Sequence, residues 1–193
     1  HGAMEHQGRY RWLIDMWRTE GYHVIMGDLP GQGLGSRSNR GHINSFDEYL
    51  VEVRSWIQDA YQYDLPIFLF GHSLGGLITI RLLQEMEVNV AGVSLSSPAL
   101  GLLSYPSKAL HAASAVLNIA YPSFKTTTGL KIDMITRDPE IRNASKNDSL
   151  FISKVSVRWY REYLTAMKEA FENIPELLDV PILLMQAGDD KVM

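Results

Sequence analysis

The sequence predicts an α/β domain in which a mostly parallel sheet has helices on both faces. Short apolar segments of strand length alternate along the chain with longer segments whose apolar residues repeat at helical spacing. The strand-like segments are continuously apolar, as expected for strands that helices cover on both sides. The chain has 193 residues, of which 46% are hydrophobic and 21% charged, so it can bury a core as one domain.

The first part of the chain is expected to form two helices with a strand between them. Residues 8–20 predict the first helix, and Tyr22–Met26 predicts a short buried strand. The Pro- and Gly-rich segment 28–33 is a loop. Ser45 and Glu48 have the spacing of a capping box at the start of the second helix. Apolar residues then repeat every 3.6 positions: Phe46, Tyr49, Leu50, Val53, Trp56, Ile57 and Tyr61.

Three further strands and a large insertion complete the pattern. Pro66–Phe70 is an apolar strand that should be buried on both faces, and residues 74–87 form the helix after it. Val90–Ser96 and Val180–Met185 are the remaining strands. More than eighty residues without a clear strand separate these two, and we interpret them as a helical insertion over the sheet edge. It holds the Ala-rich stretch Ala109–Ala120 and a long helix whose apolar side is Tyr160, Leu164, Met167, Phe171 and Ile174.

Composition and spacing exclude several classes of function. A formal net charge of −4 argues against a nucleic-acid surface, which needs clustered Lys and Arg. The sequence has no run of 18 apolar residues, so it predicts no transmembrane helix. The absence of cysteine excludes a disulfide scaffold, a thiol nucleophile and cysteine-ligated zinc. Gly31–Gly33 resembles the start of a dinucleotide loop, but the third glycine position holds Ser36. The His1–His6 segment lacks the spacing of a helical zinc pair, so no metal is expected.

The strongest chemical signal is Gly71-His72-Ser73-Leu74-Gly75, which follows an apolar strand and precedes a helix. In the Gly-x-Ser-x-Gly arrangement, a sharp strand-to-helix turn exposes the serine hydroxyl above the sheet. The turn is crowded, so small residues are needed at Gly71 and Gly75. The helix that follows directs free amides and the positive end of its dipole toward the serine. The motif therefore predicts Ser73 as a nucleophile.

A serine nucleophile also needs an oxyanion hole and an acid. One donor to the negative oxygen should be the backbone amide of Leu74, and the other should come from a loop that ends an earlier strand. The segment His1-Gly2-Ala3 suits that place, so the Ala3 amide is the candidate. Asp189 and Asp190 follow the last strand, where an acid that orients a histidine is expected. Either aspartate could serve.

Five motifs occur along the chain: His1-Gly2-Ala3-Met4-Glu5-His6-Gln7-Gly8-Arg9-Tyr10, Asp28-Leu29-Pro30-Gly31-Gln32-Gly33, Gly71-His72-Ser73-Leu74-Gly75-Gly76, Thr136-Arg137-Asp138-Pro139 and Gln186-Ala187-Gly188-Asp189-Asp190. In this order they resemble the monoacylglycerol lipase and lysophospholipase branch of the α/β-hydrolases, and its bacterial phospholipases most of all. The resemblance runs from the first residue to the last. It implies an α/β-hydrolase fold, Ser73 as the nucleophile and Asp190 as the triad acid. It also implies an oxyanion hole formed by the Ala3 and Leu74 amides.

The resemblance implies two parts that lie outside this sequence. The triad histidine is expected a few dozen residues beyond Asp190. A further strand is expected before His1, at a position in the sheet between the strands at 22–26 and 66–70. We therefore expect a fragment that lacks both ends and is inactive alone.

The expected organisation is a single truncated catalytic domain with an inserted cap. Its parts are a core at 1–97, a helical cap at 98–176, and a core strand with the acid loop at 177–193. The resemblance implies hydrolysis of monoacylglycerol or lysophospholipid esters through an acyl-serine, which needs no cofactor. A short-chain carboxylesterase and a non-catalytic binding protein are the alternatives.

The partners follow from the same resemblance. The substrate is expected to be a small lipid-like ester, with no nucleic acid and no protein partner. The leucines of the cap either line an acyl tunnel and contact a membrane or micelle transiently, or form the cap's own core. We expect a cytoplasmic protein that is at most peripheral to a membrane.

Overall fold

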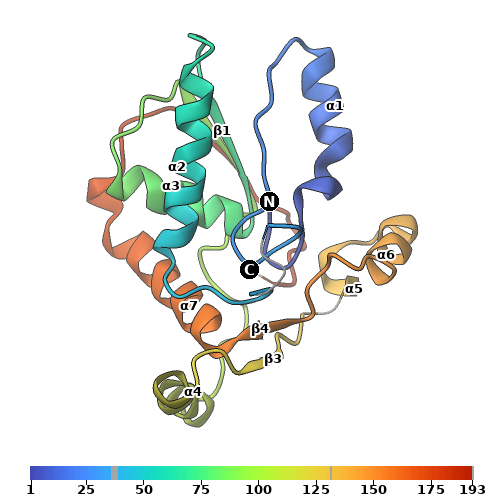
Figure 1. The fold of residues 1–193 in the computed structure, drawn as a ribbon, viewed down its shortest axis with the longest axis vertical. Coiled ribbons are helices and arrows are strands. Elements are labelled where there is room, and N and C mark those ends of the chain that lie inside the picture. Colours follow the sequence, from blue (N-terminus) through green and yellow to red (C-terminus); the bar gives the residue numbers. More distant parts are fainter. Residues whose placement is uncertain (36–38, 131, 193) are drawn as a thin grey trace.

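The computed structural model describes residues 1–35, 39–130 and 132–192, and Ser36 lies outside these ranges. Among the described residues, seven elements lie outside the segment 98–176, and the others lie within it. Figure 1 shows their arrangement. The first group is η1 (Gln7–Tyr10), α1 (Arg11–Thr19), α2 (Asp47–Tyr61), β1 (Phe68–His72), α3 (Leu74–Glu85), β2 (Gly92–Ser96) and β5 (Ile182–Met185). The second is α4 (Lys108–Ala120), β3 (Lys125–Thr127), α5 (Ile132–Ile135), α6 (Pro139–Lys146), β4 (Lys154–Ser156), α7 (Val157–Glu172) and η2 (Ile174–Glu176).

The main sheet brings the ends of distant segments to one edge. Its strands are parallel and lie in the order β1-β2-β5. Phe70 lies beside Ser94, and Ser94 lies beside Leu183. Because parallel strands end at the same edge, Ser73 after β1 and the loop after β5 share that edge. Neighbouring strands are about 4.8 Å apart, so β1 and β5 are separated by about 10 Å.

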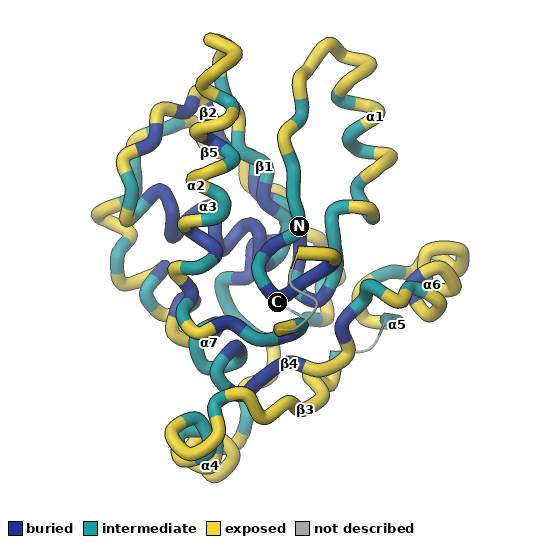
Figure 2. The backbone as a smooth tube through the Cα atoms, in the orientation of Figure 1, coloured by how far each residue is buried: buried dark blue, intermediate teal, exposed yellow. Residues whose placement is uncertain are grey.

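Helices lie on both faces of this sheet, as predicted. Residues Leu74–Leu83 of α3 are all buried, and α3 packs between β1 and the helices α2 and α7. Figure 2 shows this helix as a dark blue stretch at the centre of the molecule. On the other side, Trp17 of α1 places its ring edge-on to Phe70 of β1, with centroids 5.1 Å apart. The predicted α/β class with a parallel sheet is therefore confirmed.

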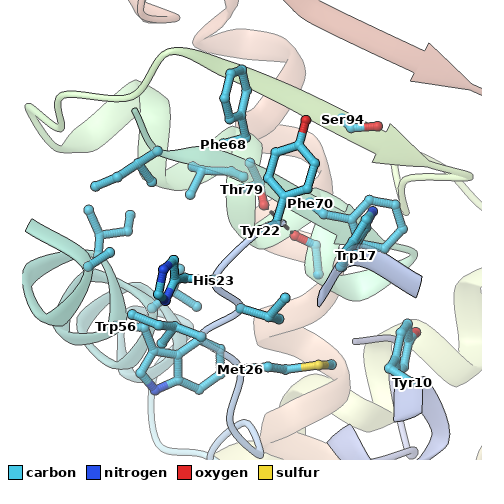
Figure 3. Close-up of a pocket in the computed structure, with 18 of the residues that line it drawn as sticks. Tyr10, Trp17, Tyr22, His23, Met26, Trp56, Phe68, Phe70, Thr79 and Ser94 are labelled. Atoms are coloured by element: carbon cyan, nitrogen blue, oxygen red, sulfur yellow. Dashed lines mark hydrogen bonds between the residues drawn. The ribbon is translucent and has the colours of Figure 1, made fainter. Parts of the chain in front are cut away.

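The predicted strand Tyr22–Met26 is wrong, because this segment runs as a loop. A cavity of about 810 Å³ lies between it and β1. Figure 3 shows Trp17 and Phe70 together on the wall of this cavity, with Met26 and Trp56 at another side. A strand is defined by a ladder of backbone hydrogen bonds to a neighbour. In the described part of the chain, no neighbouring strand pairs with Tyr22–Met26.

The prediction that the apolar strands are buried on both faces is also only partly correct. The predicted strand Pro66–Phe70 appears as β1, which starts and ends two residues later, and Phe68 is 61% exposed. All residues of β5 are exposed. The reason is position: β1 borders the cavity and β5 is the outer strand of the described sheet. Only β2, between them, approaches the burial that the apolar runs suggested.

The predicted capping box is replaced by a different pair of contacts. The Ser45 hydroxyl accepts a hydrogen bond from the Asp47 amide (3.3 Å), and the Glu48 carboxylate accepts one from the Asn44 amide (2.7 Å). The helix begins at Asp47. Glu48 is therefore its second residue and lies one position too early for the reciprocal bond to Ser45.

The segment 98–176 differs from its prediction in two respects. β3 and β4 form a two-stranded antiparallel ribbon where no strand was expected. In α7 the buried face contains Trp159, Tyr163 and Met167, whereas Phe171 of α7 and Ile174 of η2 are exposed. The Trp159 indole N–H donates to the Tyr49 hydroxyl at 2.7 Å. A buried indole needs such an acceptor, so this bond favours the observed face.

Candidate active site

Ser73 occupies the turn between β1 and α3 in a strained backbone conformation. Its φ is +51° and its ψ is −115°, a region that residues with a Cβ atom rarely adopt. The end of β2 holds the turn in place: the Ser73 amide donates to the Ser96 carbonyl at 3.0 Å. The Ser73 carbonyl accepts from the amides of Gly76 and Ala99, both at 3.0 Å. These bonds support a conformation that turns a serine side chain out of the strand direction.

The glycines around Ser73 have no space for a side chain. A Cβ atom at residue 71 would lie 2.5 Å from the Gly75 carbonyl oxygen. A Cβ at residue 75 would lie 2.9 Å from the His1 carbonyl oxygen, and one at residue 76 would lie 2.7 Å from Pro98. Gly76, to which the motif gave no separate role, is therefore as confined as the two elbow glycines.

The two predicted oxyanion donors carry free amides. Among the described residues, the backbone N–H groups of Ala3 and Leu74 have no hydrogen-bond acceptor. The loop and the helix that carry them are in direct contact, since the Gly75 amide donates to the His1 carbonyl at 3.1 Å. The structure thus brings the Ala3 segment to the N-terminus of α3, next to Ser73.

The amides on either side of Ala3 are already engaged. The Gly2 amide donates to the Glu5 carboxylate at 2.6 Å. The Met4 amide donates to the side-chain oxygen of Gln32, a residue that is 2% exposed. Met4 itself has a φ of +67°, which turns the chain sharply after Ala3. These contacts leave the Ala3 amide as the available donor of this loop.

Glu5 organises this loop and was not assigned a role by the sequence analysis. Its carboxylate accepts from the Gly2 amide, from the Tyr10 hydroxyl and from Arg9 Nε at 3.1 Å. Burial, followed by the charge of Glu5, raises the pKa of Tyr10, so the phenol stays protonated as a donor. Arg9 also donates to Ser145 Oγ of α6 at 2.8 Å. The sequence feature that could have indicated a role for Glu5 is the density of polar residues in the first motif, residues 1–10.

His6 connects the same loop to Asp148, which follows α6. Its Nε2 lies 2.8 Å from the Asp148 carboxylate, and its Nδ1 accepts from the Gly8 amide at 3.2 Å. Because Nδ1 accepts, the proton of the neutral ring is on Nε2 and points at Asp148. Burial would raise the pKa of Asp148, but hydrogen bonds from the His6 ring and the Leu150 amide, with the nearby Arg9 charge, hold it below its usual value.

The acid loop places its two aspartates in different surroundings. Asp190 accepts from the Gln186 side-chain amide at 3.1 Å and from the Val192 amide at 2.9 Å. Asp189 instead forms an ion pair with Arg137, which precedes α6, and both side chains are exposed. Asp190 therefore forms hydrogen bonds within the loop after β5, whereas Asp189 connects that loop to Arg137.

All six histidines of the chain lie in the described ranges, and none forms a hydrogen bond with Ser73. His72 bonds to the Ser96 carbonyl at 3.0 Å and so points to the end of β2. The other assigned ring contacts are His1 with Leu29 and Gly2, His6 with Asp148, His23 with Tyr63, and His42 with Ser156. In the described ranges, no group of three or more His, Asp or Glu side chains could hold a metal ion.

Across residues 1–35, 39–130 and 132–192, no helix is long and apolar enough to cross a membrane.

The full length of the chain, residues 1–193, matches the family model described as serine aminopeptidase, S33. The chain belongs to this family. A relative that is 54% identical is phospholipase YtpA from Bacillus subtilis; the match covers all of this chain and 74% of that protein. Human monoglyceride lipase is 30% identical, and the match again covers all of this chain and 64% of that protein.

A solved structure agrees with this S33 membership. The crystal structure of Paleococcus ferrophilus monoacylglycerol lipase superposes with a TM-score of 0.85 at 31% identity, covering 96% of this chain and 70% of that one. The predicted α/β-hydrolase fold, the family resemblance and the serine-hydrolase class are confirmed. The individual roles of Ser73, Asp190, Ala3 and Leu74 stay predictions.

Proposed function

We propose that this chain carries the acyl-transfer site of an enzyme that hydrolyses lipid-like carboxylic esters, with Ser73 as the nucleophile. One observation carries the assignment: Ser73 is held at positive φ before α3, and the loop that contains Ala3 contacts the first turn of that helix. Among the described residues, the Ala3 and Leu74 amides have no hydrogen-bond acceptor. A nucleophile next to unused donors is the arrangement that acyl transfer requires.

The proposed mechanism has two similar halves. Ser73 Oγ attacks the ester carbonyl carbon as its proton passes to a base, and the carbonyl oxygen becomes negative. The Ala3 and Leu74 amides donate to that oxygen. Collapse expels the alcohol, which takes up the proton, and leaves an acyl-serine. Water then attacks the acyl-serine in the same way and releases the fatty acid.

The base and the acid follow from the family resemblance. Asp190 is the proposed acid and lies in the loop after β5, at the same edge of the parallel sheet as Ser73. None of the six histidines in the described ranges forms a hydrogen bond with Ser73. We therefore keep the prediction that the triad histidine lies outside residues 1–193.

The substrate class is supported by the relatives. Their names describe a phospholipase and monoacylglycerol or monoglyceride lipases, so we propose a monoacylglycerol or a lysophospholipid as substrate. We assign residues 98–176 to the cap that covers the acyl chain. The short-chain carboxylesterase alternative differs in the acyl length that is cleaved fastest.

Assays on the protein expressed from its full open reading frame test this proposal. Hydrolysis of p-nitrophenyl esters from two to sixteen carbons, and of a monoacylglycerol and a lysophospholipid, separates the substrate classes. Ser73→Ala should lower kcat about 10⁴- to 10⁶-fold, and Asp190→Asn about 10⁴-fold. Asp189→Asn is the matched control, because Asp189 makes an exposed ion pair with Arg137. Full activity of Ser73→Ala contradicts the proposal, and a larger loss in Asp189→Asn reassigns the acid.

A membrane or micelle is the proposed site of substrate capture. α4 is an apolar helix whose backbone is coloured mostly as exposed in Figure 2. Its residues Leu110, Val116 and Ile119 are 61–85% exposed. Residues 88–132, which contain α4, hold no Asp or Glu, so this surface does not repel anionic lipid. Sedimentation with vesicles should show binding that Ile119→Glu weakens. The cytoplasmic location stays a prediction.

A further inference from the structure

The side chain of His1 lies under the proposed oxyanion loop and is 8% exposed. We propose that its imidazole is a positioning residue that orients and polarises the Ala3 amide. The ring bridges two backbone groups: its Nε2 is 3.0 Å from the Leu29 amide nitrogen, and its Nδ1 is 2.9 Å from the Gly2 carbonyl oxygen. This inference rests on the proposed role of Ala3 as an oxyanion donor.

The partners determine the tautomer of His1. A backbone amide can only donate, so Nε2 accepts from Leu29 and carries no proton. A carbonyl oxygen can only accept, so the proton is on Nδ1 and is donated to Gly2. The neutral ring is satisfied at both nitrogens. His1 therefore links the Leu29 amide to the peptide bond between Gly2 and Ala3 through two hydrogen bonds of its ring.

That peptide bond transmits the effect to Ala3. In a planar trans peptide, the C=O and N–H groups point in opposite directions. Fixing the Gly2 carbonyl toward the His1 ring therefore fixes the Ala3 N–H on the opposite side. The peptide bond before Gly2 is held independently, because the Gly2 amide donates to Glu5 at 2.6 Å. The two peptide planes that flank Gly2, which has no side chain, are therefore both restrained.

The same bond changes the charge distribution of the peptide. A donor at the carbonyl oxygen draws electron density from the amide nitrogen and makes its N–H a stronger donor, as in other hydrogen-bonded chains. The Ala3 amide has no acceptor of its own among the described residues. Its strengthened donor capacity is therefore available to a negatively charged oxygen bound beside Ser73.

Two substitutions separate the two bonds of the ring. In His1→Asn the side-chain NH₂ is as many bonds from Cα as Nδ1 and can still donate to Gly2, but the acceptor for Leu29 is lost. In His1→Gln the side-chain oxygen is as many bonds from Cα as Nε2 and can still accept from Leu29, but the donor to Gly2 is lost. The pair thus distinguishes positioning of Ala3 from simple anchoring of the loop.

Steady-state kinetics on the full-length protein give the first test. His1→Gln should lower kcat for an ester about 10- to 100-fold, somewhat less than the roughly 10²- to 10³-fold cost of deleting an oxyanion donor, with KM nearly unchanged. His1→Asn should retain most of kcat even if its melting temperature falls. The reverse pattern, with kcat retained in His1→Gln and lost in His1→Asn, overturns the inference.

A spectroscopic test works even if the proposed function fails. In a ¹⁵N–¹H spectrum of the isotope-labelled protein, the Ala3 amide resonance should move in His1→Gln and stay near its wild-type position in His1→Asn. An Ala3 resonance unchanged in His1→Gln overturns the inference whatever the substrate. An inactive wild-type protein that resists a fluorophosphonate probe contradicts the proposed function instead, while the resonance still decides the role of His1.

Discussion

Replacing Gly71 by alanine tests whether crowding shapes the turn that carries Ser73. The added Cβ would lie 2.5 Å from the Gly75 carbonyl oxygen, 2.7 Å from the Gly75 carbonyl carbon and 2.8 Å from the Gly76 Cα. Non-bonded atoms prefer about 3.5 Å or more, so each contact is too short by roughly 0.7–1.0 Å. All three neighbours are backbone atoms of the first turn of α3, which cannot rotate away as side chains do.

The cost of this substitution follows from these contacts. Adding a methyl group to a packed interior destabilises a protein by about 1–3 kcal/mol, and backbone neighbours place Gly71→Ala near ~3 kcal/mol. For a chain of this size, that corresponds to a fall in melting temperature of about 6–12 °C. A shift of α3 also moves the Leu74 amide, and misplacement by ~1 Å can cost about 10²-fold in rate.

Thermal unfolding by circular dichroism and labelling by a fluorophosphonate probe measure the two effects. Gly101→Ala is the matched control, because its Cβ would meet only the Tyr105 hydroxyl oxygen at 3.7 Å. That control should be neutral or slightly stabilising, by up to about 1 kcal/mol. A Gly71→Ala protein that melts with the control and labels at the wild-type rate would refute the argument from crowding.

Three further predictions concern stability. Tyr49→Phe leaves the buried Trp159 indole N–H without its acceptor and should lower the free energy of unfolding by about 1–3 kcal/mol in urea titrations; an unchanged midpoint contradicts this. Burial lowers the pKa of His42 below its usual 6.5, so the unfolded chain binds the proton more tightly and stability should fall as pH drops below 6.5. His42→Gln should flatten that part of the pH profile, and an unaltered slope would count against it. Arg137→Ala should change stability by less than ~1 kcal/mol, because its pair with Asp189 is exposed; a larger loss would show that the pair is structural.

The sequence predicted the features that depend on local patterns. Helical spacing of apolar residues located α1, α2, α3 and α7 to within a few residues. The positions of β1, β2 and β5 followed from short apolar runs, and their parallel arrangement followed from alternation with helices. Gly-x-Ser-x-Gly predicted a strand-to-helix turn at Ser73, and the structure has such a turn.

Pairing and burial could not be read from the same patterns. Tyr22–Met26 has the composition of a strand, yet a strand exists only where a neighbour supplies hydrogen bonds, and here a cavity lies beside it. The apolar run of β5 predicted burial, but its residues are exposed, and β5 is the outer strand of the described sheet. For α7, the position of Tyr49 selected the buried face through a hydrogen bond to Trp159.

The candidate site also combines features that the sequence predicted with features that only the tertiary structure decided. The sequence by itself determined the chemical groups: a serine in a glycine-lined turn, an acid after the last strand and a loop with a possible oxyanion donor. Only the tertiary structure decided which groups are free to act. The neighbouring amides of Gly2, Met4 and Gly75 donate to Glu5, Gln32 and His1, respectively. The Ala3 and Leu74 amides are left without an acceptor within the described ranges. Such contacts join residues far apart in the chain, and their geometry depends on how the whole domain packs.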